Sequence, residues 1–385
     1  GDGVRRVPRP RRGGAGRRDV RGLRLEIDLD KIGYNARELV ERTSRRGISV
    51  TAVTKAVLGC PDIAQVMCAA GAISLGDSRV ENLERMRTAH VDGPMLLLRS
   101  PMPSQIDRIV RADAMSVNTE TEVLSALASA ARSSGRVHDV LIMVELGDLR
   151  EGVMPDELHD TVRHVLGLSA LRLRGVGANL ACRNGIEPSE ENMAELSAMV
   201  TSVETTFGVD VEIVSGGNSA NLDWALGSSN QGRINNLRVG ESVLLGREPL
   251  RRRPIEGLHT DAFTLVGEVI ESKRKPTKPW GRPGQNSFGE TPRIDDRGVI
   301  WQTILAIGRQ DTDTADLSAP EGIEILGASS DHLIAQTADR MSCGDEIRFE
   351  PGYSAILRSM TSPFVTQHHV GSGTPVGVRN SVAGL

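Results

Sequence analysis

Hydrophobic and polar residues follow one another along this chain in two distinct rhythms. Through the first part, eight short apolar runs are separated by stretches whose apolar residues recur at helical spacing. The stretch 190–207 is the clearest, because Ser189 offers an N-cap and Met193, Leu196 and Val200 then fall on one face. The apolar runs are 49–55, 72–76, 94–99, 114–118, 140–146, 171–180, 209–215 and 237–240. This alternation predicts a parallel (β/α)8 barrel of the TIM type.

Beyond about residue 254 the helical rhythm ends and strand-like runs take over, separated by loops rich in Gly, Pro and Asp. We therefore expect an α/β fold in which the barrel is followed by a C-terminal, mostly β domain. The loop 273–293 contains four prolines and is long for a compact domain, which often marks a functional or covering loop. The expected strands are 262–272, 299–307, 323–326 and 346–349.

These patterns predict a division of the chain into four parts. Residues 1–22 form a disordered Arg-rich tail, and residues 23–255 form the barrel, including a strand of alternating polarity that opens the ordered chain. Residues 256–370 form the β domain, and residues 371–385 form a flexible tail. A solvated tail is the simplest interpretation of the N-terminal arginines, with an anion-binding role as the alternative.

Composition narrows the class of protein. The chain has 385 residues, of which 39% are hydrophobic and 25% charged, and a net charge of -4 that argues against a nucleic-acid-binding or membrane-surface protein. No apolar run is long enough to span a membrane, and the N-terminal segment lacks the apolar core of a secretory signal. The four cysteines lack the spacing of zinc sites or disulfide frameworks, so we expect reduced thiols, a cytoplasmic location and no metal.

Lys55 ends the first buried run. A lysine at the carboxyl end of a buried strand is costly as an ammonium, because desolvation lowers its pKa, and a neutral amine is what Schiff-base chemistry requires. The alternative is a lysine whose stem lies along apolar surface while its head reaches water.

Two later strand ends bear on that choice. Ser215, Gly216, Gly217, Asn218 and Ser219 lead into a predicted helix, where backbone N–H groups and hydroxyls can hold a phosphate, although an ordinary tight turn has the same residues. The eighth run carries Arg238. An amine, a phosphate cradle and an arginine at the same end of one barrel together indicate pyridoxal phosphate.

The order and content of these motifs resemble the alanine/ornithine racemase family of fold-type III pyridoxal-phosphate enzymes, and the similarity to the ornithine racemase branch is greater. The resemblance covers roughly residues 25–367. The segments that carry it are Thr54-Lys55, 76–82, 145–152, 177–181, 215–219, 237–241 and 327–332.

The resemblance implies a role for each matching residue. Lys55 bonds the cofactor and moves the α-proton on one face of the substrate, and Arg238 hydrogen-bonds the pyridine nitrogen. Arg150 lies near the cofactor's phenolic oxygen and the substrate carboxylate; the alternative is a surface ion pair with Glu151 or Asp148. Asn179 replaces a histidine that stacks near the ring. The residues expected to hold the phosphate and its surroundings are Ser215, Gly216, Asn218, Ser219, Gly240, Glu241 and Tyr353.

One family feature is missing. Alanine racemase presents, from the partner subunit, a tyrosine as the second base, whereas the corresponding stretch here is Gly308-Arg309-Gln310-Asp311. We expect His332, oriented by Asp331, or a water that it holds, to serve the opposite face of the substrate. The alternative is a histidine with a purely structural role in the β domain. Asp311 or Asp331 is a candidate for attracting a cationic substrate side chain, although Arg309 nearby argues against it.

The prediction is therefore a cytoplasmic, homodimeric, pyridoxal-phosphate-dependent racemase of an alanine-, ornithine- or lysine-like amino acid, with active sites shared between subunits. Two alternatives stay open. One is another reaction on the same fold, decarboxylation or aldol cleavage, which would account for the missing tyrosine. The other is a non-catalytic carrier of pyridoxal phosphate, although such carriers are single barrels.

Overall fold

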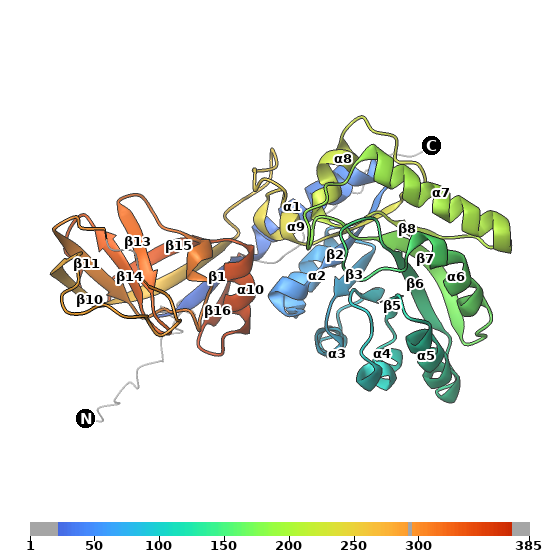
Figure 1. Ribbon diagram of the computed structural model, residues 1–385, viewed down its shortest axis with the longest axis horizontal. Coiled ribbons are helices and arrows are strands. Elements are labelled where there is room, and N and C mark those ends of the chain that lie inside the picture. Colours follow the sequence, from blue (N-terminus) through green and yellow to red (C-terminus); the bar gives the residue numbers. More distant parts are fainter. Residues whose placement is uncertain (1–21, 292–294, 372–385) are drawn as a thin grey trace, which may run out of the picture.

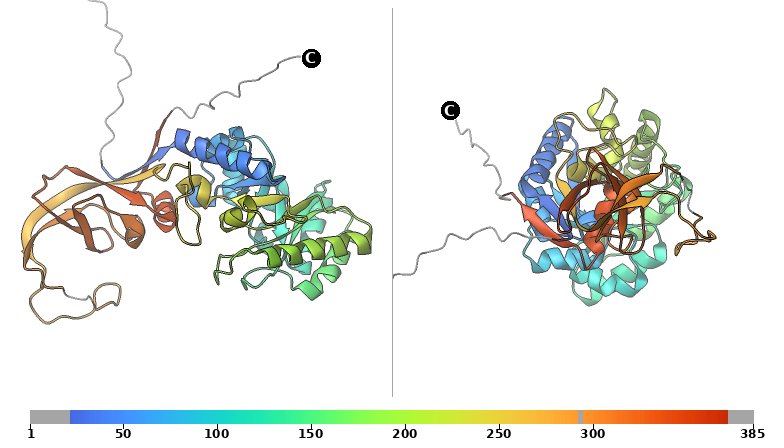
Figure 2. Two further views of the ribbon diagram at one scale, coloured as in Figure 1. Left: turned by 90° about the horizontal axis from the view of Figure 1, so that it is seen from above. Right: turned by 90° about the vertical axis from the view of Figure 1, so that its left-hand side faces the viewer.

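The computed structural model describes residues 22–291 and 295–371. The predictions of a disordered N-terminal tail and a flexible C-terminal tail concern segments that lie, apart from Gly22 and Gly371, outside these residues. The described chain forms an elongated molecule with a barrel at one end and a β domain at the other (Figures 1 and 2).

Eight parallel strands close into a barrel, as the alternation of apolar runs predicted. Their order around the barrel follows the sequence, and β9 closes the ring by pairing with β2. Each strand is short and buried on both faces, which explains why the sequence reads as apolar runs. The strands are β2 (Ser49–Val53), β3 (Ser74–Asp77), β4 (Met95–Leu97), β5 (Met115–Asn118), β6 (His138–Val144), β7 (Leu171–Ala178), β8 (Ile213–Ser215) and β9 (Asn236–Val239).

Amphipathic helices surround the barrel. In the longest, Ser189 and Asn192 form a capping box, and Met193, Leu196 and Val200 are fully buried against the strands, as their spacing predicted. The helices are α1 (Leu29–Ser44), α2 (Pro61–Ala69), α3 (Val80–Thr88), α4 (Ile106–Arg111), α5 (Thr121–Ser133), α6 (Leu158–Leu166), α7 (Glu190–Phe207), α8 (Leu222–Leu226) and α9 (Glu241–Leu245).

The barrel interior has an apolar half and a polar half. Leu96, Val117, Leu141 and Met143 from β4, β5 and β6 form a separate apolar cluster. On the other side Asn236 donates to Thr51, accepts from Ser215 and so links β9 to β2 and β8. The polar half extends to the carboxyl ends of the strands, where the charged residues lie.

The second domain is mostly antiparallel β, as predicted, but β12, β14 and β16 were not expected, and β1 and α10 also differ from expectation. The sequence assigned the first strand, β1, to the barrel; instead β1 pairs with β10 and β16, so the chain begins in the β domain. Helix α10 (Tyr353–Thr361) follows β15 in a region where we expected no helix. The strands are β1 (Arg24–Asp28), β10 (Phe263–Pro276), β11 (Val299–Leu305), β12 (Leu317–Ser318), β13 (Ile323–Ala328), β14 (Leu333–Thr337), β15 (Glu346–Pro351) and β16 (Thr366–Val370).

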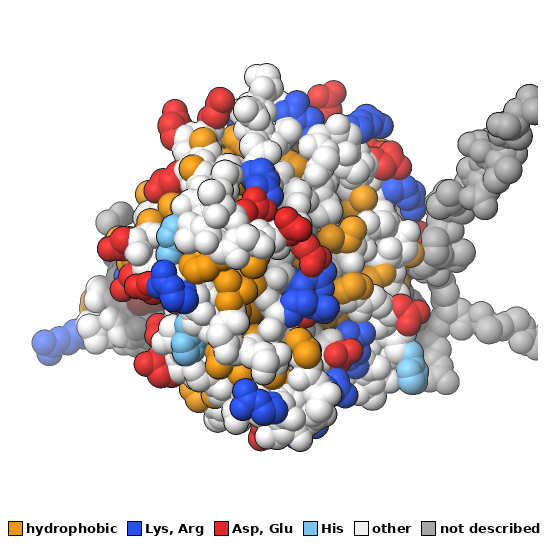
Figure 3. Space-filling view, turned by 90° about the vertical axis from the view of Figure 1, so that its right-hand side faces the viewer, with side chains coloured by type: hydrophobic (Ala, Val, Ile, Leu, Met, Phe, Trp, Pro, Cys, Tyr) orange, Lys and Arg blue, Asp and Glu red, His pale blue; other side chains and the backbone are white. Residues whose placement is uncertain are grey.

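The two parts meet at α10, which lies between the β sheet and the barrel (Figure 1). The face of the barrel turned away from the β domain carries basic, acidic and apolar side chains interspersed (Figure 3). That mixture is consistent with the small net charge of -4 for the whole chain. No helix among residues 22–291 and 295–371 has the length and apolar character needed to cross a membrane.

Candidate active site

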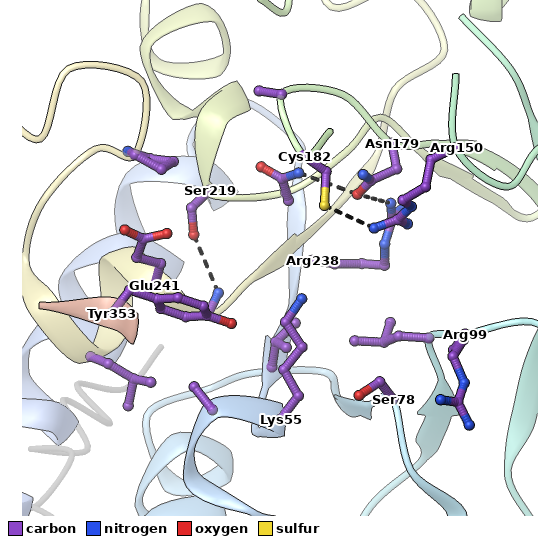
Figure 4. Close-up of a pocket in the computed structure, with 18 of the residues that line it drawn as sticks. Lys55, Ser78, Arg99, Arg150, Asn179, Cys182, Ser219, Arg238, Glu241 and Tyr353 are labelled. Carbon is purple, nitrogen blue, oxygen red and sulfur yellow. Dashed lines mark hydrogen bonds between the residues drawn. The ribbon is translucent and has the colours of Figure 1, made fainter. Parts of the chain in front are cut away.

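A pocket of about 510 Å³ lies at the carboxyl ends of the barrel strands, where the sequence placed the chemistry. Residues from several loops and from α10 converge on it (Figure 4). It brings together most of the predicted site residues, namely Lys55, Arg150, Asn179, Asn218, Ser219, Arg238, Gly240, Glu241 and Tyr353.

Lys55 enters the pocket from the 3₁₀ turn η1 (Lys55–Val57), directly after β2. The turn is anchored to β3, because Thr54 donates its backbone N–H to Gly76 and its hydroxyl to Asp77 at 2.8 Å. Burial lowers the pKa of the Lys55 amine, and the positive charges of Arg150 and Arg238 add to the effect. Loss of the proton from the Lys55 ammonium is therefore easier here than in water, as we predicted from its position at a strand end.

Arg238 lies buried in the floor of the pocket, in β9. Its guanidinium donates to the hydroxyl of Ser215 at 2.5 Å and to the carbonyl of Ala178 at 2.7 Å. Burial, followed by the charge of Arg150, lowers the pKa of Arg238 to about 10, so it remains a cation at neutral pH. Ser215 thus supports Arg238 from below and does not line the pocket.

The loop after β8 is shaped by close packing. Gly216 donates its N–H to the Asn236 carbonyl, and a Cβ at Gly216 would lie 2.7 Å from Ile234, so this glycine shapes the turn without lining the pocket. Asn218 donates to the carbonyl of Leu180 at 2.8 Å and to Asn179 at 3.2 Å. The loops after β7 and β8 are therefore held together.

A cradle for an anion lies beside this loop. The Ser219 hydroxyl accepts from the backbone N–H groups of Gly240 at 3.3 Å and Ser242 at 3.2 Å. A Cβ at Gly240 would lie 2.9 Å from the Cβ of Val53, so only glycine fits where the chain passes the barrel wall. Glu241 lines the pocket and forms an ion pair with Arg252, so its carboxylate is already engaged by a cation.

Tyr353 completes the cradle from the β domain, at the first residue of α10. Burial raises the pKa of its phenol to about 12, so the hydroxyl remains a donor at neutral pH. Among the described side chains, the Nδ2 of Asn179 is buried without a hydrogen-bond partner, although Asn179 lines the pocket. A spare donor, an N–H cradle and a buried amine fit a phosphorylated aromatic aldehyde such as pyridoxal phosphate.

Arg150 lies on the loop that follows β6. Glu145 organises this loop by accepting the backbone N–H groups of Gly147, Leu149 and Arg150. The Arg150 guanidinium donates to Cys182 Sγ at 2.9 Å and to Glu151 at 3.3 Å. The ion pair with Glu151 that formed the alternative interpretation is present, but Arg150 also faces the pocket (Figure 4).

Several lining residues were not identified from the sequence. Arg99 and Ser78 follow β4 and β3, so a complete survey of strand ends would have found them. Cys182 follows Asn179 by three residues in the loop after β7, and its relation to Arg150 depends on how two loops fold together. No local pattern signals such a contact.

Tyr353 is the one predicted residue of the β domain that lines the described pocket, whereas Arg309, Asp311, Asp331 and His332 do not reach the pocket of their own chain. Asp331 does bond the His332 ring, at 2.9 Å, as expected. Asp311 is buried and accepts from the Gly308 N–H and the Ser362 hydroxyl, which gives it a structural role in the 308–312 turn. It is therefore unsuited to attract a substrate side chain.

Arg309 is covered by the long loop after β10. It forms an ion pair with Glu290 at 3.0 Å, and its guanidinium lies 4.0 Å from the ring centre of Phe288. The loop predicted to be a covering loop thus packs on the segment that replaces the family's tyrosine motif.

A family model described as alanine racemase, N-terminal domain, matches residues 27–248. The chain belongs to the alanine racemase family. It is 38% identical over 347 residues to lysine racemase from Thermotoga maritima, a match that covers 89% of this chain and 97% of that protein. Over the same length it is 35% identical to ornithine racemase from Acetoanaerobium sticklandii, covering 89% of this chain and 98% of that protein. The chain is therefore an enzyme, an isomerase of this racemase family, as its motifs indicated.

Several solved structures share the fold. Alanine racemase from E. faecalis aligns with a TM-score of 0.71 at 19% identity, covering 91% of this chain and 98% of that one. D-threonine aldolase from Filomicrobium marinum aligns with a TM-score of 0.69 at 17% identity, covering 88% of each chain. At this identity the likeness confirms the barrel and the β domain and carries no statement about the reaction.

Other features of the described residues bear on the class of chemistry. All four cysteines are free thiols. No group of three or more His, Cys, Asp or Glu side chains among residues 22–291 and 295–371 is placed to hold a metal ion.

Proposed function

We propose that this racemase interconverts the L and D forms of an amino acid with pyridoxal 5'-phosphate as cofactor. The observation that carries the proposal is the buried Lys55 amine, whose pKa is lowered, in one pocket with a phosphate-type cradle and the Arg238 cation. The sequence relatives named lysine racemase and ornithine racemase support it over nearly their whole lengths.

Each residue has a defined task in this proposal. Ser219, the N–H groups around Gly240 and the Tyr353 hydroxyl would hold the phosphate, and the Lys55 amine would hold the aldehyde group. Arg238, as a buried cation, would disfavour protonation of the ring nitrogen. The bound cofactor supplies an electron-withdrawing ring that stabilises negative charge at the substrate α-carbon. The Lys55 amine then takes or returns the α-proton on one face.

Charge in the pocket bears on the substrate. The lining residues of one chain include five basic side chains, Lys55, Arg99, Arg150, Arg238 and Arg252, against two acidic ones, Glu151 and Glu241. This excess suits a phosphate and a substrate carboxylate, which Arg150 is placed to bind. A lysine- or ornithine-like side chain needs a further acidic group, which another copy of the chain would supply. We propose these two amino acids as the first to test, with alanine as the third.

We further propose a cytoplasmic homodimer with shared active sites, in which His332, held by Asp331, approaches the partner's pocket. Both residues are exposed in the single chain, as a contribution to another subunit requires. Sedimentation equilibrium checks the dimer directly. A monomer with full activity would contradict the shared site.

Deuterium exchange tests the reaction itself. The protein loaded with pyridoxal phosphate is incubated in deuterated water with L-alanine, L-ornithine, L-lysine and a wider panel of L-amino acids. Deuterium at the α-carbon together with D-isomer formation is the expected result. Loss of carbon dioxide or of an aldehyde instead would indicate decarboxylation or aldol cleavage, and exchange of no substrate would leave only a carrier of the cofactor.

A further inference from the structure

Cys182 lies in the pocket on the side opposite Lys55. Lys55 rises from the turn after β2, whereas Cys182 comes from the loop after β7, and in Figure 4 Nζ and Sγ face one another across the open space. The thiol is exposed, so a molecule in the pocket can reach it.

Two loops hold Cys182 in this position. Asp148 is fully buried and accepts the backbone N–H groups of Cys182, Arg183 and Asn184 at 3.1, 2.9 and 3.0 Å. Arg150, from the same loop as Asp148, donates to Sγ at 2.9 Å. The sulfur is therefore fixed as a hydrogen-bond acceptor beside the Arg150 guanidinium.

The backbone before each of these residues is strained. Ala181, which precedes Cys182, has φ +53°, and Leu149, which precedes Arg150, has φ +51°. Residues other than glycine rarely adopt this left-handed region, because the Cβ crowds the backbone there. The strain persists because Asp148 and Glu145 bind the flanking N–H groups, and it aims the thiol and the guanidinium at each other.

The other pocket-lining side chains that could exchange a proton are either held in ion pairs or remain protonated at neutral pH. Tyr353 keeps its proton at neutral pH, because burial raises its pKa to about 12. Glu241 is paired with Arg252. Glu151 is paired with Arg150 and accepts the Ser100 N–H at 3.4 Å. The family's second-base tyrosine is absent, so the face opposite Lys55 needs a different group.

We propose, resting on the racemase function above, that Cys182 is the second acid–base group and exchanges the α-proton on the substrate face opposite Lys55. In one direction Nζ takes the α-proton and becomes an ammonium, while the electron pair of the broken C–H bond stays with the substrate. The Cys182 thiol then gives its proton to the other face of the carbon and becomes a thiolate beside Arg150. In the reverse direction the thiolate takes a proton and Lys55 returns one, and exchange with solvent resets both groups.

One-sided exchange tests this assignment. Cys182→Ala and Cys182→Ser, both loaded with pyridoxal phosphate, are incubated in deuterated water with each enantiomer separately. In these variants Lys55 still exchanges the α-hydrogen of the enantiomer whose α-hydrogen points toward Nζ. Deuterium exchange of that enantiomer is therefore retained. Exchange of the other enantiomer, and racemisation in both directions, fall by about 10² to 10⁴-fold, the usual contribution of an acid–base group. Cys343→Ser, at an exposed thiol in the β domain, is the matched control and keeps wild-type rates.

Three results would overturn the assignment while leaving the racemase function intact. The first is racemisation by both Cys182 variants within about threefold of wild type, far less than the loss expected for an acid–base group. The second is an equal loss of exchange from both enantiomers, which indicates a structural role. The third is the one-sided pattern in His332→Ala instead of the Cys182 variants. A wild-type protein that exchanges no enantiomer of any amino acid would instead overturn the proposed function, and the assignment with it.

Discussion

Arg238 Nη1 donates a 2.5 Å hydrogen bond to Ser215 Oγ in the interior of the barrel, where both side chains are buried. Ser215 in turn donates to Asn236 at 2.8 Å, which connects the cation to the polar half of the barrel. The position of the guanidinium under the pocket therefore depends on a serine that never lines it.

Ser215→Ala should lower the free energy of unfolding by about 1–3 kcal/mol, because it leaves one N–H of a buried cation and the Asn236 oxygen without their partner. Racemisation should fall as well, since Arg238 then keeps only the Ala178 carbonyl at close range. Urea unfolding measures the first effect. Ser133→Ala, at an exposed position in α5, should change stability by less than about 0.5 kcal/mol, and equal stabilities of the two variants would contradict the role given to Ser215.

Lys55→Ala should abolish racemisation and the visible absorbance band of the bound cofactor, because no other lining side chain of the same chain is an amine. Lys31→Ala is the control, since Lys31 lies in α1 and pairs with Asp261 away from the pocket. Retention of the band in Lys55→Ala would show that Lys55 does not bind the cofactor.

His138, at the start of β6, should make the fold sensitive to mild acid. Burial lowers its pKa from 6.5 to about 4, and Ser116 hydrogen-bonds the ring at 2.8 Å. A depressed folded-state pKa means that the unfolded chain binds the proton first, so stability is complete above pH 6.5 and falls as the pH approaches 4. At about 1.4 kcal/mol per pKa unit, the loss is about 3 kcal/mol.

Urea unfolding at a series of pH values measures this loss. His138→Gln retains a side chain that can hydrogen-bond Ser116 but cannot take up the proton, so the variant should lose less stability than wild type across this interval. His159→Gln in α6 is the matched control. Parallel curves for wild type and His138→Gln would rule out the assigned effect.

His369 in β16 should have the opposite effect on the pH dependence of stability from His138. Its hydrogen bond with Cys60, and that with Asp62 at 2.7 Å, raise the pKa of the imidazole against the effect of burial. A raised pKa means that the folded state holds the proton more tightly, so this contribution is present below the unfolded pKa and disappears as the pH rises through the folded pKa. The advantage of wild type over His369→Gln should therefore shrink as the pH is raised, and an advantage that grows with pH would contradict the pairing.

The structural features that were predicted correctly are those that depend on the local pattern of the sequence. The strand that ends before Lys55 and the helix over 190–207 have signals within a few residues, and the structure confirms both. The partner of β1 could not be predicted, because it pairs with strands more than two hundred residues away and its alternating pattern suits either domain.

The candidate site was predicted to the extent that its residues lie at strand ends. Arg238 and Ser219 were found in this way. Helix α10 was missed, although Tyr353 was identified by its motif, because a single short amphipathic helix resembles the strand pattern around it. Cys182 was missed because its significance depends on a contact with Arg150 that only the folded loops create.

The sheet that contains both β1 and β16 carries a consequence for biosynthesis. β1 is made before the barrel, but it cannot pair until β10 and β16 have been made, and the whole barrel is made in the interval. The barrel can therefore form while β1 is still an unpaired segment. Because Tyr353 follows β15, the described pocket becomes complete only after the β domain has been made, so the barrel alone leaves this site open.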